Sequence, residues 1–301
     1  MFIYFFWVMF MQCFPLLCIL FIQVRANSEI DNHPAWKFIP TDVCGVTRYV
    51  HNSGRIINGK NAKLGQFPWI ARLGFQNFFT RRIKFNCAGT LITEIHVITA
   101  GHCGSSHDVV RLGEHDTTTK FDCTEDDICT TYQDINIKKY IFNKFDKEKL
   151  NHDICLILLE KPAKFNDFVK PACLPRGTLL DLDLIGIHAH IAGWGYTNST
   201  LETEATTLQY ISVPIVDSSK CDKIYVHQLT EYQCCAGYPK GKDSCNGDSG
   251  GPMTKSFKVD NVKRCYLIGV VSYGRSDCGA GPAVYTLICK YMLTILDNIK
   301  E

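Results

Sequence analysis

The chain has 301 residues, of which 46% are hydrophobic and 21% are charged, and this composition excludes an intrinsically disordered protein. The formal net charge is only +2, so the basic excess expected of a nucleic-acid-binding protein is missing. Sixteen cysteines are too many for a typical cytosolic protein and too few for a small disulfide-dense scaffold. These numbers favour a secreted globular protein with its own hydrophobic core and several disulfides.

The first 26 residues differ from the rest of the chain. Arg25 is the first charged side chain, and it follows a long apolar run and lies between the short side chains of Val24 and Ala26. This pattern predicts a secretory signal peptide, residues 1–26, that is cleaved after Ala26 and leaves an extracellular protein with no membrane segment. The run is also long enough to span a bilayer, so a membrane anchor is the alternative.

The next segment, residues 27–55, is polar and contains two prolines, two glycines and one cysteine, Cys44. This composition predicts a pro-segment rather than a domain.

From residue 56 onward, short β-branched and aromatic runs alternate with turn residues, which predicts an all-β sandwich or barrel. The clearest candidate strands are residues 97–99, 154–158, 188–191 and 267–271.

One helix is predicted, at the C-terminus. Met292, Ile295, Leu296 and Ile299 recur at spacings of three and four residues, so they would share one buried face of an α-helix.

Ser249 lies in the glycine-rich segment 247–251 (GDSGG), where the backbone can turn sharply and approach a ligand closely. The segment fits the G-x-S-x-G elbow of α/β-hydrolases, in which the catalytic histidine follows the serine. No histidine follows Ser249, because the last one in the chain is His227. A nucleophilic serine would therefore need an upstream histidine as its base. A solvated serine in a turn is the alternative.

Two upstream segments meet this requirement. Residues 97–103 (VITAGHC) end a strand-like run with His102, and residues 151–154 (NHDI) place Asp153 at the start of another. Taken singly, His102 is better explained as a core histidine and Asp153 as a strand-start or turn residue. His152 is a competing candidate for the base.

Taken together, four segments resemble the trypsin-like serine proteases of the chymotrypsin fold: residues 55–59 (RIING), 99–103 (TAGHC), 153–157 (DICLI) and 243–252 (DSCNGDSGGP). The resemblance covers residues 56–301 and implies two six-stranded antiparallel β-barrels with a C-terminal α-helix. Residues 111–116 (RLGEHD), followed by Cys123 and Cys129, are similar to the arthropod clip-domain and venom proteases. Residues 27–55 are too short and too poor in cysteine to be a clip domain.

The resemblance also implies a role for each catalytic residue. Ser249 would attack the scissile carbonyl, His102 would accept and return its proton, and Asp153 would orient His102. The backbone N–H groups of Gly247 and Ser249 would form the oxyanion hole. No cofactor is implied.

The resemblance places the substrate-binding residues after the serine as well as before it. Ser272, Tyr273 and Gly274 match the strand that pairs with the substrate backbone. Asp243 matches the floor of a pocket that binds Arg or Lys, because a buried carboxylate needs a cationic partner. Ala283 replaces the second wall glycine of the family, and a methyl group added to a tight pocket costs roughly 1–3 kcal/mol. We therefore expect cleavage after Arg or Lys, narrowed or weakened by Ala283.

Activation is implied by the match at Arg55 and Ile56. Cleavage between them would free the α-amine of Ile56, which would pair with Asp248 and so form the oxyanion hole and the pocket. The expected partners are protein substrates, an upstream activating protease and serpin-type inhibitors, with no nucleic acid among them.

Ten cysteines match family disulfides, and the implied pairs are Cys44–Cys173, Cys87–Cys103, Cys123–Cys129, Cys221–Cys235 and Cys245–Cys278. The other four in residues 27–301 are interpreted as buried free thiols, with one or two unusual bridges as the alternative: Cys155, Cys234, Cys265 and Cys289.

Asn198 begins the only N-glycosylation sequon. Glu114 and Asp116 lie where some relatives bind calcium, but a solvated acidic loop explains them as well, and we assign no metal.

A second function is a catalytically silent homologue that acts as a regulatory cofactor in a proteolytic cascade. Silent homologues usually lack the serine or the histidine, whereas His102, Asp153 and Ser249 are all present; Ala283 alone favours the silent alternative. The clip-like segment favours a cascade or venom role over digestion.

Overall fold

The computed structural model describes residues 27–49, 59–143, 145–198, 203–238, 247–275 and 280–300. Several predicted features lie outside the described residues: the signal peptide, Arg55, Ile56, Asp243 and the Cys245–Cys278 pair. Of Asn198 only the backbone is described.

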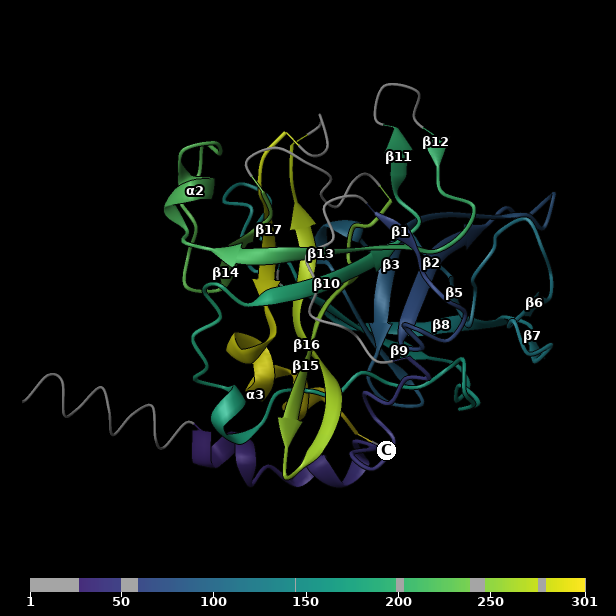
Figure 1. Cartoon of the computed structure of the whole chain (residues 1–301), viewed down its shortest axis with the longest axis horizontal. Coiled ribbons are helices and arrows are strands. Elements are labelled where there is room, and N and C mark those ends of the chain that lie inside the picture. The colour runs from purple at the N-terminus through teal and green to yellow at the C-terminus, as the bar shows by residue number, and fades with distance from the viewer. Residues whose placement is uncertain are drawn as a thin grey trace, which may run out of the picture.

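Six antiparallel strands close into a first barrel (Figure 1). In order around the barrel they are β2 (Ile70–Gln76), β3 (Ile83–Leu91), β4 (His96–Thr99), β9 (Cys155–Leu159), β8 (Gln133–Asn143) and β5 (Val109–Leu112). The pairing of β2 with β5, in which Ala71 lies opposite Leu112, closes the ring. Fully buried side chains such as Leu73 and Ile98 fill the interior, because alternate strand residues point inward. The predicted strands at 97–99 and 154–158 correspond to β4 and β9.

A second ring of six antiparallel strands forms the other half of the molecule (Figure 1). Its strands are β13 (Gln209–Val216), β10 (His188–Gly193), β15 (Pro252–Val259), β16 (Val262–Tyr273), β17 (Ala283–Leu287) and β14 (Gln233–Ala236). The pairing of β13 with β14 closes the ring, with Ile215 opposite Ala236. The predicted strands at 188–191 and 267–271 lie in β10 and β16, so the expected pair of six-stranded barrels is confirmed.

The remaining elements are short. They are η1 (Pro34–Phe38), β1 (Lys60–Asn61), η2 (Gly101–Cys103), β6 (Asp122–Cys123), β7 (Cys129–Thr130), η3 (Gly177–Leu179), β11 (Tyr196–Asn198), β12 (Thr203–Glu204), α2 (Ser219–Asp222), η4 (Ile288–Tyr291) and α3 (Met292–Asn298). Within the described ranges, no helix has both the length and the apolar character needed to cross a membrane.

The predicted C-terminal helix is α3, which continues directly from η4. Met292, Ile295 and Leu296 are buried, as their spacing predicts. Ile299 lies one residue beyond the helix in an extended conformation, yet its side chain is also buried. All four belong to the hydrophobic cluster that fills the first barrel.

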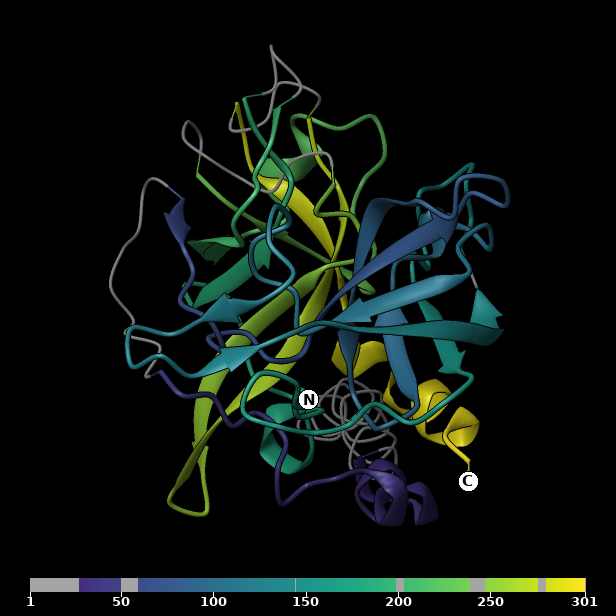
Figure 2. The same cartoon turned by 90° about the vertical axis from the view of Figure 1, so that its right-hand side faces the viewer.

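The N-terminal segment, residues 27–49, packs against the barrels. Its side chains of Ile30, Ala35 and Ile39 are buried in the same hydrophobic cluster as α3. Figure 2 shows this segment, in purple, next to the yellow C-terminal helix. The Cys44–Cys173 disulfide attaches the segment covalently. Residues 27–49 therefore belong to the folded core, although their polar composition predicts only a pro-segment.

Candidate active site

His102 lies in η2, directly after β4 of the first barrel. The Cys87–Cys103 disulfide links η2 to β3. The Thr99 hydroxyl donates a hydrogen bond to the Ala88 carbonyl oxygen, at 2.7 Å. These contacts fix the short helix that presents the imidazole.

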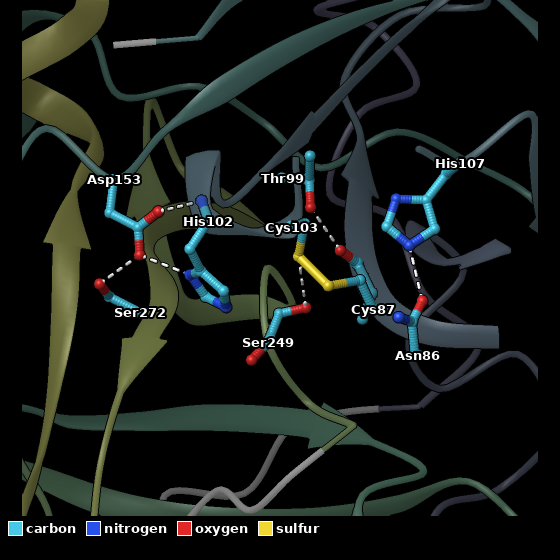
Figure 3. Close-up of a disulfide and its surroundings, with 10 residues drawn as sticks. Asn86, Cys87, Thr99, His102, Cys103, His107, Asp153, Ser249 and Ser272 are labelled. Carbon is cyan, nitrogen blue, oxygen red and sulfur yellow. Dashed lines mark hydrogen bonds and ion pairs between the residues drawn. A yellow bond between two sulfur atoms is a disulfide. The ribbon is translucent and has the colours of Figure 1, made fainter. Parts of the chain in front are cut away.

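Asp153 precedes β9 and its side chain is almost fully buried, with 1% exposed. The Oδ2 atom accepts hydrogen bonds from His102 Nδ1 at 2.7 Å and from Ser272 Oγ at 2.5 Å. The Oδ1 atom accepts one from the backbone N–H of His102 at 2.8 Å (Figure 3). Three donors offset the cost of burying a carboxylate. Because an ionised carboxylate can only accept, the contact places the ring proton on Nδ1 and leaves Nε2 as an acceptor.

Ser249 occupies the turn that precedes β15. Figure 3 shows Asp153, His102 and Ser249 in that order across the view. The Ser249 carbonyl oxygen lies 3.7 Å from Cys103 Sγ, so Ser249 lies next to the short helix that carries His102. The Ser249 carbonyl accepts a hydrogen bond from the Ala88 N–H at 2.7 Å, which ties the turn to the first barrel. Among the described residues, no hydrogen bond joins Ser249 Oγ to His102. The structure thus brings the three predicted side chains together, with one of their two contacts formed.

The backbone N–H groups of Gly247 and Ser249 indicate an anion-binding site next to the serine hydroxyl. The Gly247 and Ser249 amides have no acceptor within the part of the chain that the structure describes. Gly247 has a φ of +98°, a conformation that favours glycine. Unpaired amide donors next to a nucleophile suit the negative charge that develops on a carbonyl oxygen under attack.

Asp248 connects this turn to β10 and to the segment after it. Its Oδ1 accepts a hydrogen bond from the Gly195 N–H at 2.9 Å. A Cβ atom at Gly195 would lie 2.5 Å from Oδ2, and one at Gly193 would collide with the same carboxylate. Sequence analysis missed both glycines, although the G-W-G string around Trp194 was a usable signal. Ile56, the expected partner of Asp248, is outside the described residues.

The predicted substrate-binding residues lie at the end of β16 and the start of β17. Ser272 and Tyr273 end β16, and Gly274 follows. A Cβ atom built on Gly274 would lie 3.3 Å from the Ala283 Cβ, so the Ala283 methyl group faces Gly274. The bond from Ser272 to Asp153 is a feature that sequence analysis did not predict.

Four of the five implied disulfides are present: Cys44–Cys173, Cys87–Cys103, Cys123–Cys129 and Cys221–Cys235. The remaining described cysteines are free thiols, as expected: Cys155, Cys234, Cys265 and Cys289. Cys155 and Cys265 are buried as predicted, whereas Cys234 and Cys289 are only partly buried. Burial raises the pKa of Cys155 to about 12 and that of Cys265 to about 11, so both thiols are protonated at neutral pH.

The two acidic residues considered for calcium both have protein partners. Glu114 is buried, contacts Arg111 at 3.0 Å and accepts a hydrogen bond from the His115 N–H. Burial raises the pKa of Glu114. Asp116 accepts hydrogen bonds from the Thr118 backbone and hydroxyl. These contacts give both carboxylates a structural role without a metal.

One group of described side chains has metal-ligand spacing: Cys87, His102 and Cys103. Both sulfur atoms belong to a disulfide, so the group cannot supply thiolate ligands. A cavity of about 790 Å³ borders β14, η4 and residues 180–185, and none of the three catalytic candidates lines it.

The two barrels and the C-terminal helix define the chymotrypsin fold. The Trypsin family matches residues 56–295. The chain is 37% identical to the CLIP domain-containing serine protease HP8 of Bombyx mori, across 91% of this chain and 77% of that protein. It is 34% identical to a venom protease of Bombus pensylvanicus, across 79% of this chain and 96% of that protein. The chain therefore belongs to the trypsin family of serine proteases.

A solved structure agrees with this assignment. The crystal structure of the Drosophila Grass clip serine protease of the Toll pathway matches with a TM-score of 0.72 and 30% identity, over 86% of this chain and 75% of that one. Within its family, the chain is related to insect clip-domain and venom proteases.

Proposed function

We propose that the chain is a secreted serine endopeptidase that hydrolyses peptide bonds after Arg or Lys. The observation that carries the proposal is the 2.7 Å contact between Asp153 Oδ2 and His102 Nδ1, with Ser249 next to the short helix that carries His102 (Figure 3). A homologue that acts only by binding has no need of this arrangement, so the silent-cofactor function ranks second.

In the proposed mechanism, His102 Nε2 removes the hydroxyl proton as Ser249 Oγ attacks the scissile carbonyl. The amides of Gly247 and Ser249 bind the resulting oxyanion. The imidazolium then gives its proton to the leaving amine as the C–N bond breaks, and water releases the acyl group by the same steps in reverse. Asp153 stabilises the imidazolium throughout. Catalytic contacts commonly tighten when substrate binds, which accommodates the open Ser249–His102 contact.

An organophosphonate serine probe tests the proposal directly. Activated protein should be labelled at Ser249, and Ser249→Ala should abolish labelling and lower kcat by about 10⁶-fold. The exposed Ser105→Ala variant is the control and should be labelled like the wild type. Absence of labelling in the folded, activated wild type would favour the silent cofactor instead.

The proposed specificity depends on Asp243 and on the wall formed by Gly274 and Ala283. Because the Ala283 methyl faces Gly274, Ala283→Gly should widen the pocket and raise kcat/KM for Arg substrates by about tenfold. Short substrates with Arg, Lys or an aromatic residue before the scissile bond provide the measurement. A preference for the aromatic substrate would contradict the role of Asp243.

We also propose activation by an upstream protease that cuts after Arg55. The new α-amine of Ile56 would pair with Asp248. The negative charge of this carboxylate would raise the pKa of the amine, so the amine would stay protonated at neutral pH. Activity would then be lost as pH rises through that raised pKa. Arg55→Gln should remain inactive after treatment with the activating protease, and constitutive activity of this variant would exclude the switch.

The proposed setting is an extracellular cascade. The similarity to the Grass protease of the Toll pathway and to the clip and venom relatives supports a role in which the enzyme cleaves a protein substrate. Control by serpin-type inhibitors is part of the same proposal. Removal of the signal peptide would make Asn27 the mature N-terminus, which N-terminal sequencing of secreted protein checks. Glycosylation at Asn198 is part of the same proposal.

A further inference from the structure

His152 was a competing candidate for the base, and the structure gives it a different environment. It directly precedes Asp153, but its Nδ1 lies 2.9 Å from the Tyr291 hydroxyl. Its ring packs edge-on against Tyr232, with the centroids 4.6 Å apart. Tyr291 is itself buried, with 3% exposed, and packs against Tyr232. His152 is therefore held between two tyrosines, while His102 contacts Asp153.

The backbone at His152 explains why such a clamp is needed. Its φ is +52°, in the left-handed region that residues with a Cβ atom disfavour. This left-handed residue leads directly into a tight turn around Asp153, in which the Ile154 N–H donates to the His152 carbonyl at 2.8 Å. Asp153 lies inside this turn, so the turn determines the direction of its carboxylate.

Two further hydrogen bonds brace the turn. The His152 N–H donates to Asn151 Oδ1 at 2.8 Å, and Thr286 Oγ1 on β17 donates to the Asp153 carbonyl at 2.9 Å. These bonds hold the backbone, and neither holds the His152 ring. The contacts described for the ring are those with Tyr291 and Tyr232. Burial raises the pKa of Tyr291, so its hydroxyl keeps its proton beside His152 Nδ1.

We propose that His152 is a positioning residue: its ring, clamped by Tyr291 and Tyr232, holds the left-handed turn that aims the Asp153 carboxylate at His102. The inference rests on the proposed function, since it concerns the orientation of the proposed catalytic carboxylate. Tyr291 is the last residue of η4 and precedes α3, so the clamp also connects the catalytic loop to the C-terminal helix.

Two variants separate the clamp from the backbone conformation. His152→Gly adopts the left-handed turn readily but has no ring to clamp, whereas Tyr291→Phe keeps its ring and loses only the hydroxyl. With a short Arg substrate, and with rates expressed per titrated active site, we expect kcat to fall about tenfold for His152→Gly and about threefold for Tyr291→Phe, with KM unchanged. The double variant should be no slower than His152→Gly, because both changes remove one interaction.

Tyr140→Phe is the matched control, because it removes a comparable hydrogen bond, from Tyr140 to the His107 carbonyl, outside the clamp. It should keep the wild-type kcat. The proposal is overturned if His152→Gly and Tyr291→Phe both stay within twofold of the wild-type kcat. It is also overturned if the control loses as much activity as they do.

A second measurement does not depend on activity. The proton on His102 Nδ1, which Asp153 accepts, should give a downfield proton NMR signal that shifts or broadens in His152→Gly and Tyr291→Phe but not in Tyr140→Phe. Unchanged signals in both clamp variants would overturn the inference. If the wild type proved inactive, the proposed function would fail, and this signal would still decide whether the clamp orients Asp153.

Discussion

Single atoms govern the geometry around the serine turn. The carboxylate of Asp248 fits against Gly193 and Gly195 because neither residue has a Cβ atom. Asp248 is flanked in the sequence by Gly247 and Ser249, whose amides have no acceptor among the described residues. The position of Asp248 and the anion site are therefore coupled through the backbone of one short turn.

Gly195→Ala should reduce activity through this coupling. The new methyl group would displace Asp248, move the Gly247 amide and remove much of the oxyanion stabilisation, so we expect kcat to fall by about 10²- to 10³-fold. Gly59→Ala is the control, since its Cβ atom would find only ordinary contacts, the nearest at 3.6 Å. Steady-state kinetics on a short substrate distinguish the two variants. An unimpaired Gly195→Ala enzyme would show that the turn tolerates the displacement.

The limits of sequence analysis are clearest at this scale. Chain order required an upstream histidine, and the resemblance to the trypsin-like serine proteases then selected His102, Asp153 and Ser249. The roles of the Ser272 and Tyr291 hydroxyls could not be predicted from the sequence. Ser272 contacts Asp153 across 119 residues of sequence, and Tyr291 contacts His152 across 139. Local patterns do not contain such long-range contacts, which only the folded chain creates.

At the scale of the element, strands and helix followed from periodicity, whereas packed irregular segments did not. The β9 strand is a continuous apolar run, β4 contains the apolar β-branched pair Val97 and Ile98, and α3 shows its buried stripe in the spacing of its residues. Residues 27–49 have too few apolar residues for a periodic signal, yet four of them are buried in the core: Ile30, Ala35, Ile39 and Cys44. Their burial depends on the surface that α3 and the barrel offer, which is a tertiary property.

One element should make stability depend on pH. His96, at the start of β4, is buried with 2% exposed, and burial lowers its pKa from 6.5 to about 4. The unfolded chain therefore binds a proton in a pH range where the folded chain does not, so the stability contribution is complete above pH 6.5 and is lost as pH falls toward 4. Over this range the loss amounts to about 3 kcal/mol.

Denaturant unfolding at several pH values measures this effect. The difference in unfolding free energy between the wild type and His96→Gln should shrink as pH falls from 7 to 4, because the variant lacks the titrating ring. A difference that stays constant with pH would mean that His96 does not titrate in this range.

For the whole molecule, the disulfides differ in how much chain they constrain. Cys44–Cys173 spans 129 residues, whereas Cys123–Cys129 spans 6. Chain entropy predicts that a longer closed loop destabilises the unfolded state more. The first bridge also joins the N-terminal segment to the barrels, so its effect concerns the assembly of the entire fold.

Replacing both cysteines of each pair with serine should reveal this difference. We expect a loss of about 5 kcal/mol in unfolding free energy for the Cys44–Cys173 pair and about 2 kcal/mol for the Cys123–Cys129 pair. Chemical denaturation of the uncleaved proteins gives both values. Equal losses would indicate that the N-terminal segment contributes little beyond its noncovalent contacts.

The burial of Ile30, Ala35 and Ile39 beneath the C-terminal helix has a consequence for maturation. A cut after Arg55 would sever the backbone but release nothing, because the upstream piece is both bridged by sulfur and embedded in the apolar interior. The mature protein would thus consist of two chains, and the smaller chain would remain bound as part of the folded structure.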